Sequence, residues 1–149
     1  NYENIIFSRS FSKGLGLAGL RIGYLITNSQ IIENINKIKN FKNLTSISQS
    51  SAIFVLENLN ILDERINDLE KSKEIILNFL TDSHLKFFSG DTNFVLIDLN
   101  NNSKIKKNLY LKKFIIREFN SSILNGFIRI TFPQSIHANM LCKTIEESF

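Results

Sequence analysis

Two short segments, Ser10-Phe11-Ser12-Lys13 and Gly19-Leu20-Arg21-Ile22-Gly23-Tyr24, frame a glycine-rich turn near the start of the chain. The apolar run Ile5-Ile6-Phe7 comes just before them and predicts a short buried strand. Between Leu20 and Ile26, apolar residues recur at alternate positions, which is typical of a second strand. The sequence therefore predicts a strand, a turn and a second strand, with a lysine and an arginine in or beside the turn.

The turn gathers four side chains whose chemistry suits an aldehyde cofactor that carries a phosphate. Lys13 has a primary amine, which can form an imine with an aldehyde once it is deprotonated. Arg21 can clamp a phosphate dianion, and the hydroxyls of Ser10 and Ser12 can donate further hydrogen bonds to it. The alternative is that Lys13 and Arg21 are solvated charges on a surface loop. The residue types alone are compatible with both interpretations.

The same turn also matches the dinucleotide-binding pattern G-x-G-x-x-G, from Gly14 to Gly19. That fold requires a helix to begin at the motif and an acidic residue about 20 positions further on. Here the next segment is predicted to be a strand, and Glu33 comes too early and lies in a helical pattern. We therefore set the dinucleotide interpretation aside.

The rest of the chain mixes helical and strand patterns. Helices are predicted from Asn28 or Ser29 to Ile38, from Ser46 to Asn58, from Ile61 to Leu80 and from Ser135 onward, and strands at Phe94–Leu99, Phe114–Ile116 and Phe127–Thr131. In the second helix, Ile47, Ala52, Val55 and Leu56 are expected to face inward. Elements in this order predict an α/β or α+β fold.

The two segments around the turn resemble the S-x-S-K…G-x-R-x-G-Y signature of fold-type I pyridoxal-phosphate aminotransferases of class I and II. The stretch Asn43–Ala52 is similar to the one that opens the next helix in histidinol-phosphate aminotransferase-like proteins. Thr92–Leu96 resembles a small-domain strand of the family, and residues 115–118 and 127–131 resemble its paired Ile-Val-Arg and Leu-Arg-Ile-Thr elements.

The resemblance implies a fold-type I PLP-transferase architecture, of which this chain carries the C-terminal half. Residues 1–60 would be the end of the large cofactor-binding domain, residues 61–82 a long connecting helix, and residues 83–149 the small α/β domain. The sequence also starts at Asn1 without an initiator methionine, so we expect it to be a piece of a longer protein.

By the same resemblance, the cofactor is pyridoxal 5'-phosphate and Lys13 is its Schiff-base lysine. Ser10, Ser12 and Arg21 would hold the cofactor phosphate. The partner is expected to be a small-molecule amino-acid substrate, including phosphorylated ones such as histidinol phosphate, whose amino group is transferred.

Three residues further along the chain match the family's substrate-binding positions. Arg129 matches the arginine that binds the acidic group of the substrate, where a planar guanidinium suits a carboxylate. Arg117 is a second candidate for this role, with a charge at a strand edge as the alternative. Asn93 is a candidate pocket residue, although an Asn beside a strand is as often part of a turn.

Two departures from the family leave other functions open. The aspartate, stacked aromatic and tyrosine that complete the family's site come from the upstream half, so a catalytically incomplete folded fragment is one alternative. After Arg129 the chain continues Ile130-Thr131-Phe132-Pro133-Gln134, where the family commonly has Ile-Thr-Val-Gly-Thr. PLP-dependent decarboxylases of phospho-amino acids share the lysine and arginine motifs, so decarboxylation is the second alternative.

Composition narrows the remaining classes. The 18 basic and 14 acidic residues give a net charge of +4, and the lysine run from 104 to 113 reads as a solvated helix face, so no nucleic-acid partner is expected. Neither an apolar run of membrane-spanning length nor a set of residues at metal-ligand spacing around His84 and His137 is present in the sequence. The single cysteine, Cys142, favours a reducing compartment, and we expect a cytoplasmic enzyme, with a homodimer implied by the resemblance.

Overall fold

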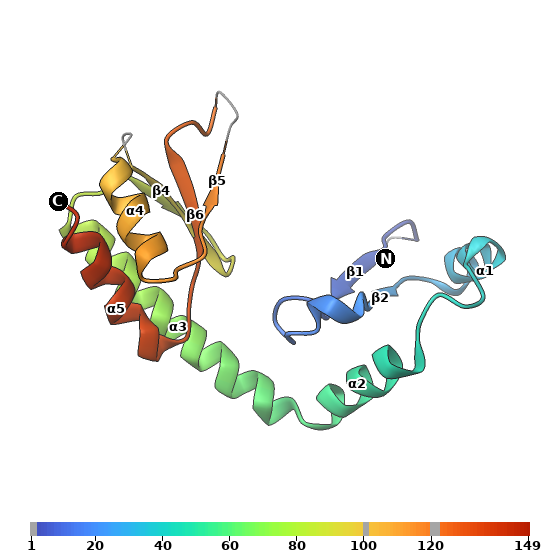
Figure 1. The fold of residues 1–149 in the computed structure, drawn as a ribbon. Helices are drawn as coiled ribbons and strands as arrows, with labels where there is room; N and C mark the ends of the chain where they lie inside the picture. Colours follow the sequence, from blue (N-terminus) through green and yellow to red (C-terminus); the bar gives the residue numbers. More distant parts are fainter. Residues whose placement is uncertain (1–2, 100–101, 120–122) are drawn as a thin grey trace. The chain divides into compact units, whose positions relative to one another are not determined.

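The computed structural model describes residues 3–99, 102–119 and 123–149 (Figure 1). The chain divides into two compact units, Asn1–Arg65 and Ile66–Phe149. Both units combine helices with an antiparallel sheet, so the predicted mixture of helices and strands is confirmed. Among the described residues, no helix is long and apolar enough to cross a membrane.

The first unit is built on a two-stranded antiparallel sheet. Strand β1 (Phe7–Ser10) pairs with β2 (Gly23–Ile26), with Phe7 opposite Ile26 and Ser10 opposite Gly23. The predicted buried strand at residues 5–7 is wrong in both position and burial, because β1 begins at Phe7 and its residues are exposed. The reason is that the buried core of this unit is formed by Phe11, Ile22 and Ala52, none of which lies on either strand. The 3₁₀ helix η1 (Ala18–Leu20) occupies the start of the segment expected to be the second strand.

Two helices follow, and both begin at a side-chain cap. Helix α1 (Ser29–Ile38) is capped by Asn28, whose side chain accepts a hydrogen bond from the backbone of Ile31. Helix α2 (Ser46–Glu57) is capped by Thr45 in the same way. Both helices were predicted from the sequence to within a residue or two.

Helix α2 buries a narrower face than the sequence predicts. Ser48 and Ala52 are its buried residues, and Ala52 joins Phe11 and Ile22 in a small core. Ile47 and Leu56, which were expected to face inward, are 70% and 53% exposed. The contact is restricted to small residues at i and i+4, so the loop of the first unit approaches the helix closely.

The second unit is a four-stranded antiparallel sheet with helices packed on it. Its strands are β3 (Phe87–Ser89), β4 (Phe94–Asp98), β5 (Arg117–Glu118) and β6 (Phe127–Thr131), in the spatial order β3-β4-β6-β5. Its helices are the long α3 (Leu59–Asp82), whose first turns belong in sequence to the first unit, α4 (Ser103–Leu111) and α5 (Ser135–Glu146).

One face of this sheet forms the core. Val95 and Ile97 on β4 and Ile128 and Ile130 on β6 are all buried. Residues from α3, α4 and α5 complete the same cluster, and Figure 1 shows α4 and α5 side by side on the sheet. Because side chains alternate along a strand, the residues between these, Arg129 among them, point to the opposite face. The strand predicted at Phe127–Thr131 is confirmed.

One prediction for this unit is wrong. The strand expected at Phe114–Ile116 lies instead at Arg117–Glu118, because Lys113 adopts a left-handed φ of 63° after α4 and the chain joins the sheet later. Helix α5 begins at Ser135, as predicted, and its N-cap residue Gln134 makes no side-chain hydrogen bond to it. The backbone N–H and hydroxyl of Ser135 instead donate to the carboxylate of Asp68 on α3, so this end of the helix is capped from another helix.

Candidate functional site

The predicted lysine lies in a loop that is closed at its base. Phe11 donates its N–H to the carbonyl of Ile22 at 3.1 Å, and Leu17 donates to the carbonyl of Phe11 at 3.0 Å. The side chains of Phe11 and Ile22 are both buried. The ends of the loop are therefore held together by hydrogen bonds and by apolar packing, while the polar residues between them remain accessible.

Lys13 begins a tight turn within this loop. Its carbonyl accepts the N–H of Gly16 at 3.1 Å, and Gly16 has a φ of +70°, which favours glycine. A Cβ at Gly16 would also collide with the guanidinium of Arg65. The Lys13 side chain is exposed. The turn thus presents the lysine amine on the surface of its unit.

The other three predicted cofactor residues flank the lysine. Ser10 accepts the N–H of Ser12 at its Oγ, at 3.1 Å, which leaves the Ser10 hydroxyl proton free to be donated. Arg21 has a left-handed φ of 50°, and its Nη1 donates to the carbonyl of Ala18 at 3.2 Å. The structure therefore brings Ser10, Ser12, Lys13 and Arg21 into one loop. Two hydroxyls, an amine and a guanidinium form a donor set that fits a phosphorylated aldehyde.

The sequence reasoning missed the residue that anchors this loop. Ser48 on α2 is 4% exposed, and its Oγ donates to the carbonyl of Leu20 at 3.0 Å, directly before Arg21. Its hydroxyl also lies 2.9 Å from that of Thr45. Ser48 and Ala52 are small residues four positions apart, so they share one face of α2, and this spacing is the sequence signal that indicates such a close contact.

The three predicted substrate residues lie in the second unit. Arg129 is half-buried on β6, with its guanidinium carbon 5.1 Å from the centre of the Phe94 ring. Arg117 is exposed on β5, and its guanidinium carbon lies 5.5 Å from the centre of the Phe119 ring.

Asn93 precedes β4, and its backbone carbonyl accepts the N–H of Phe132 at 3.0 Å. The structure thus brings Arg117 and Arg129 together on neighbouring strands, whereas the cofactor residues belong to the other unit. The roles proposed for all seven residues remain predictions.

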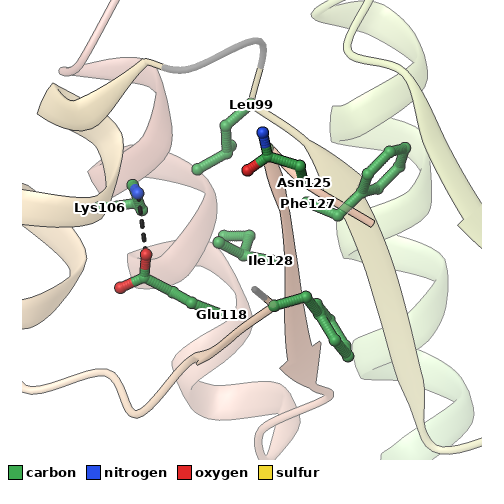
Figure 2. Close-up of a pocket in the computed structure, with 8 residues that line it drawn as sticks. Leu99, Lys106, Glu118, Asn125, Phe127 and Ile128 are labelled. Atoms are coloured by element: carbon green, nitrogen blue, oxygen red, sulfur yellow. Dashed lines mark hydrogen bonds and ion pairs between the residues drawn. The ribbon is translucent and has the colours of Figure 1, made fainter. Parts of the chain in front are cut away.

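A hollow of about 200 Å³ opens in the second unit, and its lining includes a lysine and a glutamate (Figure 2). It is lined by Leu99, Lys106, Glu118, Phe119, Asn125, Gly126, Phe127 and Ile128. The side chains of Lys106 and Glu118 point toward each other there, at 2.8 Å. None of the predicted site residues is among those that line this hollow.

Hydrogen bonds perturb two titrating groups beside the hollow. The pKa of Glu118 lies below its usual value, chiefly because Lys106 and then Tyr110 donate hydrogen bonds to its carboxylate. The pKa of Tyr110 is raised, first because its hydroxyl donates to Glu118 and second because of burial. The two hydrogen bonds therefore stabilise the carboxylate form of Glu118.

Comparison with known proteins places this geometry in context. Residues 1–145 match the family model described as aminotransferase class I and II. The histidinol-phosphate aminotransferase of Caldanaerobacter subterraneus subsp. tengcongensis is 34% identical over 148 residues, which cover 98% of this chain and 42% of that protein.

Solved structures give the same result. The histidinol-phosphate aminotransferase of Sinorhizobium meliloti, in complex with pyridoxal-5'-phosphate, has a TM-score of 0.79 and 29% identity over 98% of this chain and 41% of its own. The L-threonine-O-3-phosphate decarboxylase of Porphyromonas gingivalis has the same fold, with a TM-score of 0.78 and 20% identity over 99% of this chain and 47% of its own. The chain thus spans less than half the length of each of these proteins.

Proposed function

Because the chain belongs to the family of class I and II aminotransferases, we propose that it forms the C-terminal portion of a pyridoxal-phosphate-dependent aminotransferase. The substrate would be an amino acid, with phosphorylated amino acids such as histidinol phosphate as the leading class. The observation that carries the proposal is the loop that presents Lys13 between two serine hydroxyls and the Arg21 guanidinium. The similarity of nearly the whole chain to histidinol-phosphate aminotransferases supports it.

Each residue of the loop has a task in such a reaction. Bound pyridoxal phosphate supplies an electron sink that stabilises negative charge on the substrate carbon. Lys13 would hold the cofactor and carry a proton at its Nζ, because the exposed amine can reach a ligand over the turn. The hydroxyls of Ser10 and Ser12 and the guanidinium of Arg21 would donate to the phosphate.

The arginines of the second unit would hold the substrate. Arg129 stands on the open face of β6, and the ring of Phe94 supports its guanidinium. Arg117 is its direct neighbour on β5, and both would bind an acidic group. Asn93 would contribute to the substrate pocket. We propose that residues 1–60 belong to the large domain, residues 61–82 to a connecting helix and residues 83–149 to the small domain.

Reductive trapping with borohydride tests the lysine assignment. The 149-residue chain is incubated with pyridoxal phosphate, reduced and digested, and we expect the stable label on the peptide that contains Lys13. Lys13→Ala should lose the label, whereas Lys42→Ala, which removes another exposed loop lysine of the same unit, should keep it. Equal labelling of many lysines would contradict the assignment and favour the alternative of a folded fragment without a working site.

Decarboxylation is the second candidate reaction. The residues after Arg129, Phe132-Pro133-Gln134, depart from the common aminotransferase pattern, and this is the observation in its favour. Both reactions begin on the same cofactor, and the bond that breaks is the one aligned with its π system. An assay of the protein that contains this chain, given a phosphorylated amino acid, separates the two by product: a keto compound for transfer, carbon dioxide for decarboxylation.

We further propose that the enzyme is a cytoplasmic homodimer. Large apolar side chains are strongly exposed in the first unit, with Ile38 at 86% and Phe41 at 96%, which supports a surface that another polypeptide covers. Sedimentation of the protein that contains this chain should give twice the mass of one chain. A monomer at high concentration would contradict the proposal.

A further inference from the structure

Two arginines of the second unit are placed side by side at a cost. Arg117 on β5 pairs directly with Arg129 on β6, so both side chains leave the sheet on the same open face. Like charges at directly opposite positions repel each other. Among the residues that the structure describes, no carboxylate lies within ion-pair distance of either guanidinium. This repulsion opposes the pairing of β5 with β6, so a contact that holds β5 in register favours the arrangement.

The backbone pairing of β5 alone gives this strand little stability. It consists of two residues, Arg117 and Glu118, and pairs with β6 alone. Its second residue lies opposite Ile128, a core residue, so Glu118 points to the helix-covered face while Arg117 points to the open one. The two residues of the strand thus connect opposite faces of the sheet.

Glu118 fastens the strand to helix α4 by two hydrogen bonds. Lys106 donates its Nζ to Oε2 of Glu118 at 2.8 Å, and the hydroxyl of Tyr110 donates to Oε1 at 2.9 Å. Figure 2 shows the Lys106–Glu118 pair bridging the helix and the strand beside the hollow. Because each carboxylate oxygen has its own donor from α4, the two hydrogen bonds together restrict the rotation and displacement of this partly exposed side chain.

We propose that Glu118, held by Lys106 and Tyr110, is a positioning residue that keeps Arg117 beside Arg129 so that the pair can clamp one acidic group of the substrate. The inference rests on the proposed function, in which these arginines bind that group. The new element is that a residue on the helix-covered face of the sheet, Glu118, determines the position of the two arginines on the opposite face. A phosphate dianion fits two adjacent guanidinium groups better than one, since each can donate in parallel to separate oxygens.

Charge alone and positioning predict opposite effects when Glu118 is removed. Glu118→Ala takes a negative charge away from the neighbourhood of two cations, so by charge alone an anion should bind more tightly. If Glu118 positions Arg117, the same change should weaken binding. Tyr110→Phe removes one of the two hydrogen bonds without changing any charge, and it isolates the positioning effect.

The experiment titrates the 149-residue chain with inorganic phosphate at constant ionic strength and follows the side-chain Nε–Hε signals of Arg117 and Arg129 by NMR. We expect Tyr110→Phe to weaken phosphate binding about two- to tenfold, the factor for one lost hydrogen bond. Glu118→Ala should weaken it further, and Glu118→Gln, which keeps an acceptor, should recover part of the loss. Should Glu118→Ala fail to fold, Tyr110→Phe still decides the question.

A matched control separates the local effect from general charge. Glu147→Ala removes an exposed carboxylate that also faces a lysine, Lys143, but at the C-terminal end of α5. It should leave phosphate binding unchanged or slightly tighter. Arg129→Ala, which removes half of the clamp, should abolish phosphate binding. If it does, tighter binding in Glu118→Ala or unchanged binding in Tyr110→Phe would overturn the positioning role of Glu118 and leave the arginine clamp intact. No saturable phosphate signal in the unaltered chain would overturn the arginine clamp itself and this inference with it.

Discussion

Two buried serines of the second unit should respond in opposite directions to the same substitution. Ser72 on α3 is completely buried, and among the described residues its hydroxyl has no hydrogen-bond partner. Ser148 is 1% exposed, but its hydroxyl donates to the carbonyl of Thr144 at 2.8 Å and accepts from Nδ2 of Asn108 at 2.8 Å. The two sites match in residue type and burial and differ in hydrogen bonding.

The magnitudes follow from that difference. Leaving a buried polar group without a partner costs about 1–3 kcal/mol, which Ser72→Ala recovers. Alanine also has a higher helix propensity than serine, by about 0.5 kcal/mol. The lost contacts of one oxygen offset part of this, so we expect the free energy of unfolding to rise by about 1–2 kcal/mol. Ser148→Ala should lower it by about 1–3 kcal/mol, because it removes two hydrogen bonds and leaves the Asn108 amide short of an acceptor.

Native-state hydrogen exchange is the appropriate assay, because it reads the stability of the second unit by itself. The amides of Ile76 and Ile128, both in its core, should exchange more slowly in Ser72→Ala and faster in Ser148→Ala. A faster exchange in Ser72→Ala would refute the reasoning. It would mean that the serine hydroxyl has a partner, such as a buried water, that stabilises the helix.

Three further predictions concern other sites. The pKa of Asp68 is lowered from 3.8, first by the hydrogen bond from the Ser135 side chain and then by the one from the Ser135 backbone. The contribution of Asp68 to the free energy of unfolding should therefore be complete above about pH 5 and be lost as the pH falls through the lowered pKa. The free energies of unfolding of Asp68→Asn and the unaltered chain should accordingly differ at neutral pH and become equal in acid. Burial raises the pKa of Cys142 to about 11, so its thiol should react slowly with a disulfide reagent in native protein at neutral pH and rapidly in denaturant; fast native labelling would contradict this. Ser48→Ala should destabilise the lysine loop by about 1 kcal/mol in exchange measurements on the Leu20 amide, whereas Ser50→Ala, exposed on the same helix, should not.

Local patterns were enough to predict the elements that are stabilised locally. Asn28 as a cap, the limits of α2 and the five residues of β6 all follow from neighbours in sequence. The same holds for the lysine loop, since its glycines and its polar residues are contiguous in the chain. The family motif in this loop was also sufficient to predict its candidate site residues.

Elements that depend on distant partners were predicted poorly. Strand β3 was missed, and β5 was shifted by three residues, because both are short edge strands whose limits are set by the strand they pair with. The residue that caps α5 was not predicted, because the carboxylate of Asp68 that accepts from Ser135 lies 67 residues away in the sequence. Ile47 was assigned to the core of α2 because hydrophobicity does not reveal which face of a helix has a partner.

For Arg117 and Arg129, the sequence predicts which face of the sheet a side chain occupies but not which side chain lies beside it. Alternation along β6 correctly places Arg129 opposite the core, since Ile128 and Ile130 are buried. The same pattern says nothing of which residue stands beside Arg129, because register between strands is a property of the sheet. The pairing of Arg117 with Arg129, and the hold of Glu118 that accounts for it, therefore emerge from the structure. If the clamp determines which acidic substrates are accepted, the residues that determine specificity extend to helix α4, on the covered face of the sheet.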